Sequence, residues 1–332
     1  MVTAAAETLR ILRVRFNLKA ISEIRLGDYK GSTFRGVLGH ALKSISCFSR
    51  RTCLTQCAYP KTCPYGYLFE TPVPEGAEKM KKYSSAPHPF ILTPPLEIKK
   101  VYWPGEFFHF DLTLVGKGVD YLPYFVYAFE KQGEKGMGKS RGFFEVVSVL
   151  GLNHRAENQA ETLLYINTEK MLVKEAVEKT IDQFAFQEKL ENKDHPPLLS
   201  SVKLQFLTPI RLKFEESLSH KLEFHILIRN LLRRLSSLLY FHEGIEVNWN
   251  FKELIEKALT VKKTEDKTYW YDWERYSNRQ ETRMKLGGLM GEAEYADVPS
   301  DFALFLKAGE MVHVGKNTSF GLGKYVVIEG SG

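Results

Sequence analysis

The sequence predicts an α+β protein made of two tandem ferredoxin-like (βαββαβ) modules, with a cysteine-rich insertion in the first. The order strand, helix, two extended segments, helix, glycine-rich loop, strand occurs twice along the 332 residues. The composition, with 44% hydrophobic and 26% charged residues, is that of a globular chain able to bury a core. Together these observations exclude disorder as the dominant state and favour two modules of the same plan.

The first repeat begins with alternating apolar and polar residues over 12–20, the pattern of a half-buried strand. Apolar residues at helical spacing between Phe34 and Ile45 predict the first helix. Extended segments follow near 90–98 and 107–115, and a short helix is predicted over 121–131. The glycine-rich loop GEKGMGKSRG then leads into a strand over 143–150.

The second repeat starts after the Pro196-Pro197 break with a strand over 201–213 and a helix over 219–242. Extended segments near 261–271 and 284–295, a helix over 302–312, the loop HVGKNTSFGLGK and the strand YVVIE complete it. We therefore predict an N-terminal domain over residues 1–152, with the cysteine-rich insertion, and a C-terminal domain over 200–332, with the terminal glycine-rich loop. A connecting segment, including a charged helix over 169–193, should occupy residues 153–199.

Basic residues exceed acidic residues by 46 to 40, and this net charge of +6 leans weakly towards polyanionic partners. No apolar stretch is long enough to span a bilayer, which needs roughly 20 residues. The N-terminus lacks the apolar core of a secretory signal. A cytoplasmic protein without a membrane partner is expected.

The octapeptide GEKGMGKS, residues 133–140, matches the phosphate-binding pattern G-x-x-x-x-G-K-[ST]. A P-loop needs a strand before it and a helix after it, whereas here a predicted helix precedes the loop and a strand follows. We therefore expect no nucleotide cofactor. Both glycine-rich loops instead suit a backbone that runs close to a phosphate–sugar chain and presents its N–H groups to anions. The simpler alternative, two tight turns with solvated lysines, stays open.

Five segments resemble the Cas6 family of CRISPR repeat-processing endoribonucleases, which belong to the RAMP class of tandem ferredoxin-like proteins. They are GSTFRGVLGHALKSISC, CPYGYLFE, RYSNRQ, MKLGGLMGEAEY and HVGKNTSFGLGKY. The resemblance runs from about residue 10 to residue 329. It implies CRISPR repeat RNA as the partner, and metal-independent cleavage within the repeat that leaves a 2′,3′-cyclic phosphate. The alternative is a non-catalytic RAMP subunit that binds crRNA inside a CRISPR effector complex and has no need of a catalytic histidine.

His40, on the first predicted helix, is the position at which the resemblance places the catalytic residue. On a helical wheel it lies away from the apolar stripe, with Lys43 one turn further on and Gly36 one turn back. Attack by a ribose 2′-hydroxyl needs a base, an acid and donors for the charged phosphorane. An imidazole serves as acid or base near neutral pH, and Lys43 would stabilise the phosphorane. Tyr29 is the candidate second acid–base residue.

His313, beside the second loop, is either a second catalytic candidate, an RNA contact or a cation at a helix C-terminus. Arg229 and Arg233 on the predicted helix 219–242 form either a solvated face or a ridge for RNA phosphates. Arg279 is either part of the same groove or a turn residue. The full set of candidate RNA-binding residues is Lys139, Arg141, Arg229, Arg233, Arg279, His313, Lys316, Thr318, Ser319, Gly321, Gly323 and Lys324.

All four cysteines (Cys47, Cys53, Cys57 and Cys63) fall within one short segment. Four thiolates suit a closed tetrahedral zinc site, but the spacing lacks the common C-x2-C pair. Structural zinc, disulfides and free thiols therefore stay open. A closed site would have no free ligand position, so we expect no metal cofactor for catalysis.

Overall fold

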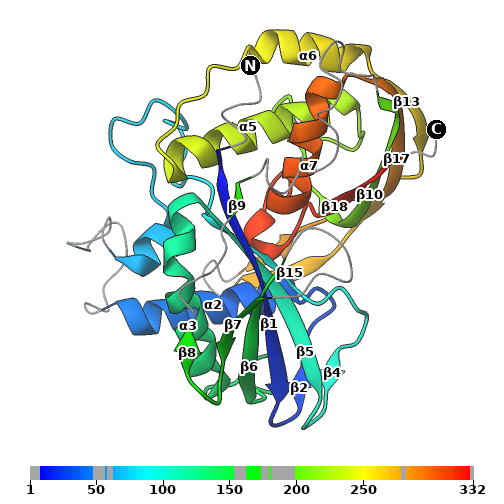
Figure 1. Ribbon diagram of the computed structural model, residues 1–332. Helices are drawn as coiled ribbons and strands as arrows, with labels where there is room; N and C mark the ends of the chain where they lie inside the picture. Colours follow the sequence, from blue (N-terminus) through cyan, green and yellow to red (C-terminus); the bar gives the residue numbers. More distant parts are fainter. Residues whose placement is uncertain are drawn as a thin grey trace. The chain divides into compact units, whose positions relative to one another are not determined.

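The computed structural model describes residues 8–47, 57, 63–152, 162–172, 179–180, 199–277 and 282–329 (Figure 1). The chain divides into two compact units. The N-terminal unit consists of Arg10–Lys179 with Phe241–Gly244, and the C-terminal unit consists of Met1–Leu9, Thr180–Tyr240 and Ile245–Gly332. Within the described part of the chain, no helix is long and apolar enough to cross a membrane.

The N-terminal unit contains a ferredoxin-like sheet whose four central strands lie in the order β3-β5-β1-β6, each antiparallel to its neighbours. The strands are β1 (Arg10–Ala20), β3 (Phe90–Thr93), β5 (Phe107–Val115) and β6 (Phe144–Gly151). Helix α2 (Gly31–Ser46) lies between β1 and β3 in the chain, and α3 (Leu122–Gly133) lies between β5 and β6. This strand order and these two crossover helices confirm the predicted βαββαβ plan.

Shorter elements surround that plan in the N-terminal unit. They are β2 (Ile24–Arg25) paired with β4 (Val101–Tyr102), a π-helical turn at Gly66–Glu70, a 3-10 turn at Gly116–Tyr121, and β7 (Thr162–Ile166), β8 (Met171–Leu172) and β9 (Lys179–Thr180). β7 pairs with β6 and β8 with β7, so the first sheet continues into the predicted connecting segment 153–199. The prediction of a helix over 169–193 is wrong at β8 and β9, because these residues form strands.

The core of the N-terminal unit forms because β1 alternates, with its even-numbered residues buried from Leu12 to Ala20. The rings of Phe16 and Phe110 stack 4.7 Å apart, and Phe129 from α3 lies 4.5 Å from Phe110. Such aromatic pairs stabilise a core beyond the area they bury. They fix both helices on one face of the sheet.

The C-terminal unit repeats the topology, with strands in the order β13-β17-β10-β18. The strands are β10 (Leu199–Ile210), β13 (Lys262–Asp266), β17 (Gly288–Val298) and β18 (Tyr325–Glu329), and the helices are α5 (Phe224–His242) and α7 (Ala303–Val312). Each position corresponds to one in the N-terminal sheet, so the tandem duplication is confirmed.

Additional elements of the C-terminal unit are β11 (Lys213–Phe214) with β12 (Ser217–Leu218), α6 (Phe251–Thr260), β14 (Tyr269–Tyr271), β15 (Glu274–Ser277) with β16 (Thr282–Lys285), and 3-10 turns at Ser300–Phe302 and Thr318–Phe320. Helix α6 was not predicted. Its start carries a cap, because the Asn250 side chain accepts a hydrogen bond from the Glu253 N–H at 3.2 Å. Helix α5 begins at Phe224 and not at 219, since the residues after the hairpin β11–β12 first form a turn, in which the Ser219 N–H donates to Leu212 O and the Lys221 N–H to Ser219 Oγ.

Candidate functional site

His40 lies on the exposed side of α2, in the middle of the helix. Phe34, Leu38, Ala41 and Leu42 are buried on the opposite side, as the apolar stripe predicts. Lys43, one turn towards the C-terminus, is half-buried. The imidazole and the ammonium group therefore occupy neighbouring positions on one side of a rigid helix.

The π-helical turn Gly66–Glu70, within the segment CPYGYLFE, packs on α2 next to His40. Phe69 fills the space beside Gly39, where a Cβ atom would overlap the phenyl ring. The Tyr65 ring stacks on Phe69 with centroids 5.4 Å apart. The absence of a side chain at Gly39 thus leaves room for an aromatic ring of the protein itself. At Gly36, by contrast, an added Cβ atom would meet open space, and that glycine leaves the surface before His40 bare.

Two cations of α2 lie over this aromatic pair. The Arg35 guanidinium carbon is 4.2 Å from the Phe69 centroid, and Lys43 Nζ is 5.8 Å from the Tyr65 centroid. Cation–π contacts of this kind restrain long side chains that would otherwise move freely. The aromatic turn therefore helps to position the positive charges of Arg35 and Lys43, one on each side of Gly39.

Arg35 also contacts His88, a residue that sequence reasoning missed. Arg35 Nη2 lies 3.1 Å from His88 Nε2, and His88 Nδ1 lies 2.8 Å from Thr71 Oγ1. Because a guanidinium only donates, Nε2 must accept and Nδ1–H must donate to Thr71, which leaves His88 neutral. The sequence offered one signal for this contact: Arg35 lies four residues before Gly39, on the same face of α2.

Tyr29 precedes α2 and lies far from His40. Residues 31 and 40 of the helix are separated by about 14 Å along its axis, and Tyr29 comes two residues earlier still. Burial raises the pKa of the Tyr29 phenol well above its ordinary value. The structure therefore does not bring Tyr29 together with His40 and Lys43, and it favours the protonated phenol.

The two interior glycines of α2, Gly36 and Gly39, give opposite predictions for the same substitution. Gly36→Ala should raise the free energy of unfolding by about 0.5–1 kcal/mol, because alanine is the better helix former and the site is open. Gly39→Ala should lower it, since the Phe69 ring must move away from the new methyl group. Chemical denaturation of the two variants checks this. Equal effects would mean that Phe69 does not pack on Gly39.

The first glycine-rich loop docks on the segment that contains β2. The Lys139 N–H donates to Arg25 O, and Ser140 Oγ–H donates to Glu23 O, both at 2.9 Å. A Cβ atom on Gly142 would overlap the Glu23 carbonyl oxygen. The glycines thus allow the close approach that was expected, but the neighbouring backbone is the protein's own.

The same loop follows α3 and precedes β6, which is the reverse of the strand–loop–helix order of a P-loop. Its backbone amides at Met137 and Gly142 close a tight turn by bonding each other's carbonyl groups at 2.9 Å. The Lys139 and Arg141 side chains remain exposed. Together with Lys135, which is also exposed, they present the positive charge of this loop to solvent.

The second glycine-rich loop is largely buried. His313 is 2% exposed, and its Nδ1–H donates to Leu322 O at 3.2 Å. Thr318 and Ser319 are 7% and 6% exposed. The expectation that these three side chains contact a ligand directly does not fit this structure, because all three are almost completely buried.

Bonds to the end of β10 hold the second loop in place. Thr208 Oγ1 donates to Gly321 O and accepts from the Lys324 N–H, each at 2.8 Å. The Gly323 N–H donates to Pro209 O at 3.0 Å. Gly321 and Gly323 are buried with positive φ angles of 86° and 76°, which glycine adopts without strain. Lys316 is the exposed cation of the loop and Lys324 is half-buried.

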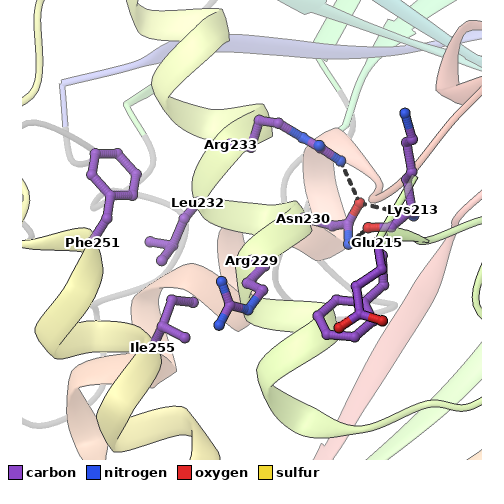
Figure 2. A pocket seen from close by; sticks show the side chains of 9 residues that line it. Lys213, Glu215, Arg229, Asn230, Leu232, Arg233, Phe251 and Ile255 are labelled. Carbon is purple, nitrogen blue, oxygen red and sulfur yellow. Dashed lines mark hydrogen bonds between the residues drawn. The ribbon is translucent and has the colours of Figure 1, made fainter. Parts of the chain in front are cut away.

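Helix α5 exposes Arg229 and Arg233, as its polar pattern predicted. Both line a pocket of the C-terminal unit (Figure 2). Ser236, which the pattern had placed on the same polar face, is 5% exposed. Arg279 lies outside the described residues.

Of the four cysteines, Cys47, Cys57 and Cys63 are described, and these three are not joined in disulfides. Cys63 Sγ lies 3.8 Å from Ser46 O, at the end of α2. No three potential metal ligands gather among the described residues. Cys53 and most of the predicted insertion lie outside them, so the zinc prediction stays untested.

If the four thiolates bind zinc, freshly purified, reduced protein should contain one zinc ion per chain by elemental analysis. Cys53→Ser should lose that metal without loss of the α2 site, because a closed structural site has no open position for substrate. Metal-free wild-type protein that was never exposed to a chelator would contradict the prediction.

Two family models match neighbouring parts of the sequence. A model described as an N-terminal domain, AF_1859_N, matches residues 9–177. The model of the CRISPR-associated endoribonuclease Cas6 matches residues 204–325. No curated protein sequence matches the chain.

Solved structures share the fold along nearly the whole chain. A protein of a partial Cas6-RT-Cas1–Cas2 complex aligns with 98% of the chain at 14% identity and a TM-score of 0.56, and the chain spans 47% of that protein's length. A Cas6 in a product complex aligns with 96% of the chain and 99% of its own length, at 14% identity and a TM-score of 0.55. For a Thermus thermophilus Cas6 the same coverage comes with 13% identity and a TM-score of 0.52.

At these identities the alignments establish a shared fold. The Cas6 model covers the second module, including the loop after α7, and the other model covers the first module with α2. The fold that the chain shares with Cas6 structures contains both modules. The second module of the chain thus matches the model of the CRISPR-associated endoribonuclease Cas6, and nearly the whole chain shares the tandem ferredoxin-like fold of Cas6 structures.

Proposed function

We propose that this protein is an endoribonuclease that processes precursor CRISPR RNA by cutting within its repeats. The observation that carries the proposal is the exposed His40 on α2 of the first module, with Lys43 one turn away and the bare surface of Gly36 before it. The match of residues 204–325 to the model of a CRISPR-associated endoribonuclease suggests the substrate class.

The proposed reaction is attack of a ribose 2′-oxygen on the adjacent phosphorus. The 2′-O–P bond forms, the P–O5′ bond breaks, one proton leaves the 2′-hydroxyl and one reaches the departing 5′-oxygen. The products are a 2′,3′-cyclic phosphate and a 5′-hydroxyl. The mechanism needs no metal ion, because His40 moves a proton and the Lys43 ammonium stabilises the negative phosphorane.

Tyr29 is the candidate for the second acid–base role. The raised pKa of Tyr29 keeps its phenol protonated, so it is suited to donate a proton and not to accept one. Its distance from His40 along α2 argues against both groups acting on one phosphate. We propose His40 as the main proton-transfer residue, with Tyr29 as a residue to test and not as its established partner.

The RNA backbone is proposed to contact the exposed cations of the two loops, Lys139, Arg141 and Lys316, with the half-buried Lys324. Backbone phosphates supply most of the affinity in such complexes and carry little sequence information. His313, Thr318, Ser319, Gly321 and Gly323 would then act by holding the second loop in shape. This reassigns them from contacts to supports of the binding surface.

The deciding experiment incubates the protein with RNA of the repeat from its own CRISPR array, in the presence of EDTA. Cleavage at one position with a 2′,3′-cyclic phosphate end supports the proposal. Tight binding without cleavage would instead indicate a subunit that holds crRNA in an effector complex. Cleavage that stops in EDTA and returns with added Mg²⁺ would contradict the metal-independent mechanism.

The contribution of the second loop is testable through salt dependence. Replacing Lys316 and Lys324 with alanine should flatten the plot of log affinity against log salt by roughly one unit per lost phosphate contact. Lys262, exposed on β13 of the same unit, provides the matched control. An unchanged slope in the double variant would show that neither lysine neutralises a phosphate.

A further inference from the structure

The C-terminal unit contains a pocket of about 530 Å³ that the proposed cleavage chemistry does not use (Figure 2). It lies between the hairpin β11–β12, helix α5 and helix α6. Its lining consists of Lys213, Phe214, Glu215, Arg229, Asn230, Leu232, Arg233, Phe251 and Ile255. The volume is in the range of pockets that hold small organic ligands, about 300–1,000 Å³.

Three cations line this pocket. Arg229 and Arg233 are exposed one helical turn apart on α5, and Lys213 comes from the hairpin. Among the described residues, none of the three forms an ion pair with a carboxylate. Arginines that line one pocket without forming ion pairs are suited to a phosphate group, which accepts their charge-assisted hydrogen bonds.

The remaining lining is not what a simple anion needs. Phe214 and Phe251 contribute aromatic rings and Ile255 an aliphatic side chain, and the Arg229 guanidinium carbon lies 6.0 Å from the Phe214 centroid. Glu215, on the same hairpin, would repel inorganic phosphate but accepts hydrogen bonds from an amino or hydroxyl group. Cations, aromatic rings on two sides and one acceptor together match a nucleoside phosphate, which carries all three complementary groups.

Asn230 holds this arrangement in place before any ligand binds. It is 3% exposed, and its amide bonds both backbone groups of Lys213, at 3.3 Å to the N–H and 3.2 Å to the carbonyl oxygen. Its Oδ1 also accepts from Arg233 Nη2 at 2.7 Å, as the dashed lines in Figure 2 show. One buried side chain therefore fixes the hairpin to α5 and directs one of the two arginines.

We propose that this pocket binds one nucleoside phosphate unit, with the phosphate on Arg229, Arg233 and Lys213 and the base against the aromatic rings. The unit is either a free nucleotide or one nucleotide of an RNA strand away from the cut. The RNA source rests on the function proposed above, whereas the free-nucleotide source is independent of it.

The test measures binding of AMP, adenosine, inorganic phosphate and a five-nucleotide adenylate RNA to the full chain by calorimetry. AMP or the short RNA should bind more tightly than adenosine or phosphate alone. Arg229→Gln and Phe214→Ala should each weaken that binding about tenfold, since they remove a phosphate contact and a stacking surface. Lys262→Gln, which removes an exposed cation from the same unit outside the pocket, should leave it unchanged. Thermal melts of each variant establish that the unit is folded.

The outcomes separate the two sources. A free nucleotide is supported if the pocket variants weaken AMP binding while neither AMP nor the variants change the affinity for repeat RNA. Variant-sensitive RNA binding, with AMP a weak competitor, supports a nucleotide of the strand. Inorganic phosphate binding as tightly as AMP, or folded variants that bind both probes like the wild type, overturns the proposal. None of these readouts requires cleavage, so failure of the proposed ribonuclease activity would be recognised separately.

Discussion

Replacing His40 with alanine should lower the rate of repeat-RNA cleavage by about 10²–10⁴-fold while repeat-RNA affinity changes only a few-fold. Proton transfer by a positioned side chain accounts for a rate effect of this size. Affinity should persist because the phosphate-binding cations stand elsewhere in the chain, and an imidazole contributes little to binding a polyanion. Single-turnover cleavage with protein in excess, together with equilibrium binding, separates the two effects.

Ser44 provides the matched control, because it is exposed on α2 one turn after His40 and its hydroxyl bonds Ala41 O at 2.9 Å. Ser44→Ala should cut like the wild type. The cleavage rate of Lys43→Ala should lie between those of His40→Ala and Ser44→Ala. The substitution removes a charge that stabilises the phosphorane but keeps the proton carrier. Full cleavage by the His40 variant would remove His40 from the chemistry. His313 would not replace it without movement of its loop, since that side chain is 2% exposed.

The periodic elements were predictable because their signals are local. Strand β1 alternates and α2 carries an apolar stripe, and either pattern fits one secondary structure only. The repeated order of such elements was then enough to predict both sheets. Helix α6 had a local signal that was missed, the Asn250–Glu253 cap.

The packing around the glycines was not predictable, because what fills the space beside a glycine comes from distant sequence. Gly39 is occupied by Phe69, thirty residues further along the chain. The second loop is bonded through Thr208, more than a hundred residues earlier. A glycine next to a lysine indicates close approach of something, and the sequence does not say whether it is a ligand or the protein's own backbone. The pocket on α5 was missed for the same reason, since its walls come from three separate elements.

A substitution in the second glycine-rich loop should have a similarly large effect, this time on the stability of the fold. Gly323→Val should lower the free energy of unfolding by about 3 kcal/mol or more. A β-branched residue is strained at a φ of 76°, which alone costs about 1–3 kcal/mol. The added side chain would also overlap the carbonyl oxygen of Val314, whose N–H donates to Gly323 O at 3.0 Å. Because that oxygen belongs to a hydrogen-bonded backbone, it has little freedom to move aside.

Asn317→Gly is the matched control, since Asn317 also has a positive φ, 64°, and glycine adopts it freely. Denaturant unfolding should find that variant close to the wild type and the Gly323 variant much weaker. Repeat-RNA binding should follow stability in both, and it should recover for Gly323→Val under conditions where the variant is folded. In Lys316→Ala, by contrast, affinity should fall at unchanged stability, because that side chain is exposed. If a well-folded Gly323→Val protein instead loses RNA binding, the glycine faces the ligand, and its first assignment as an RNA contact would be the correct one.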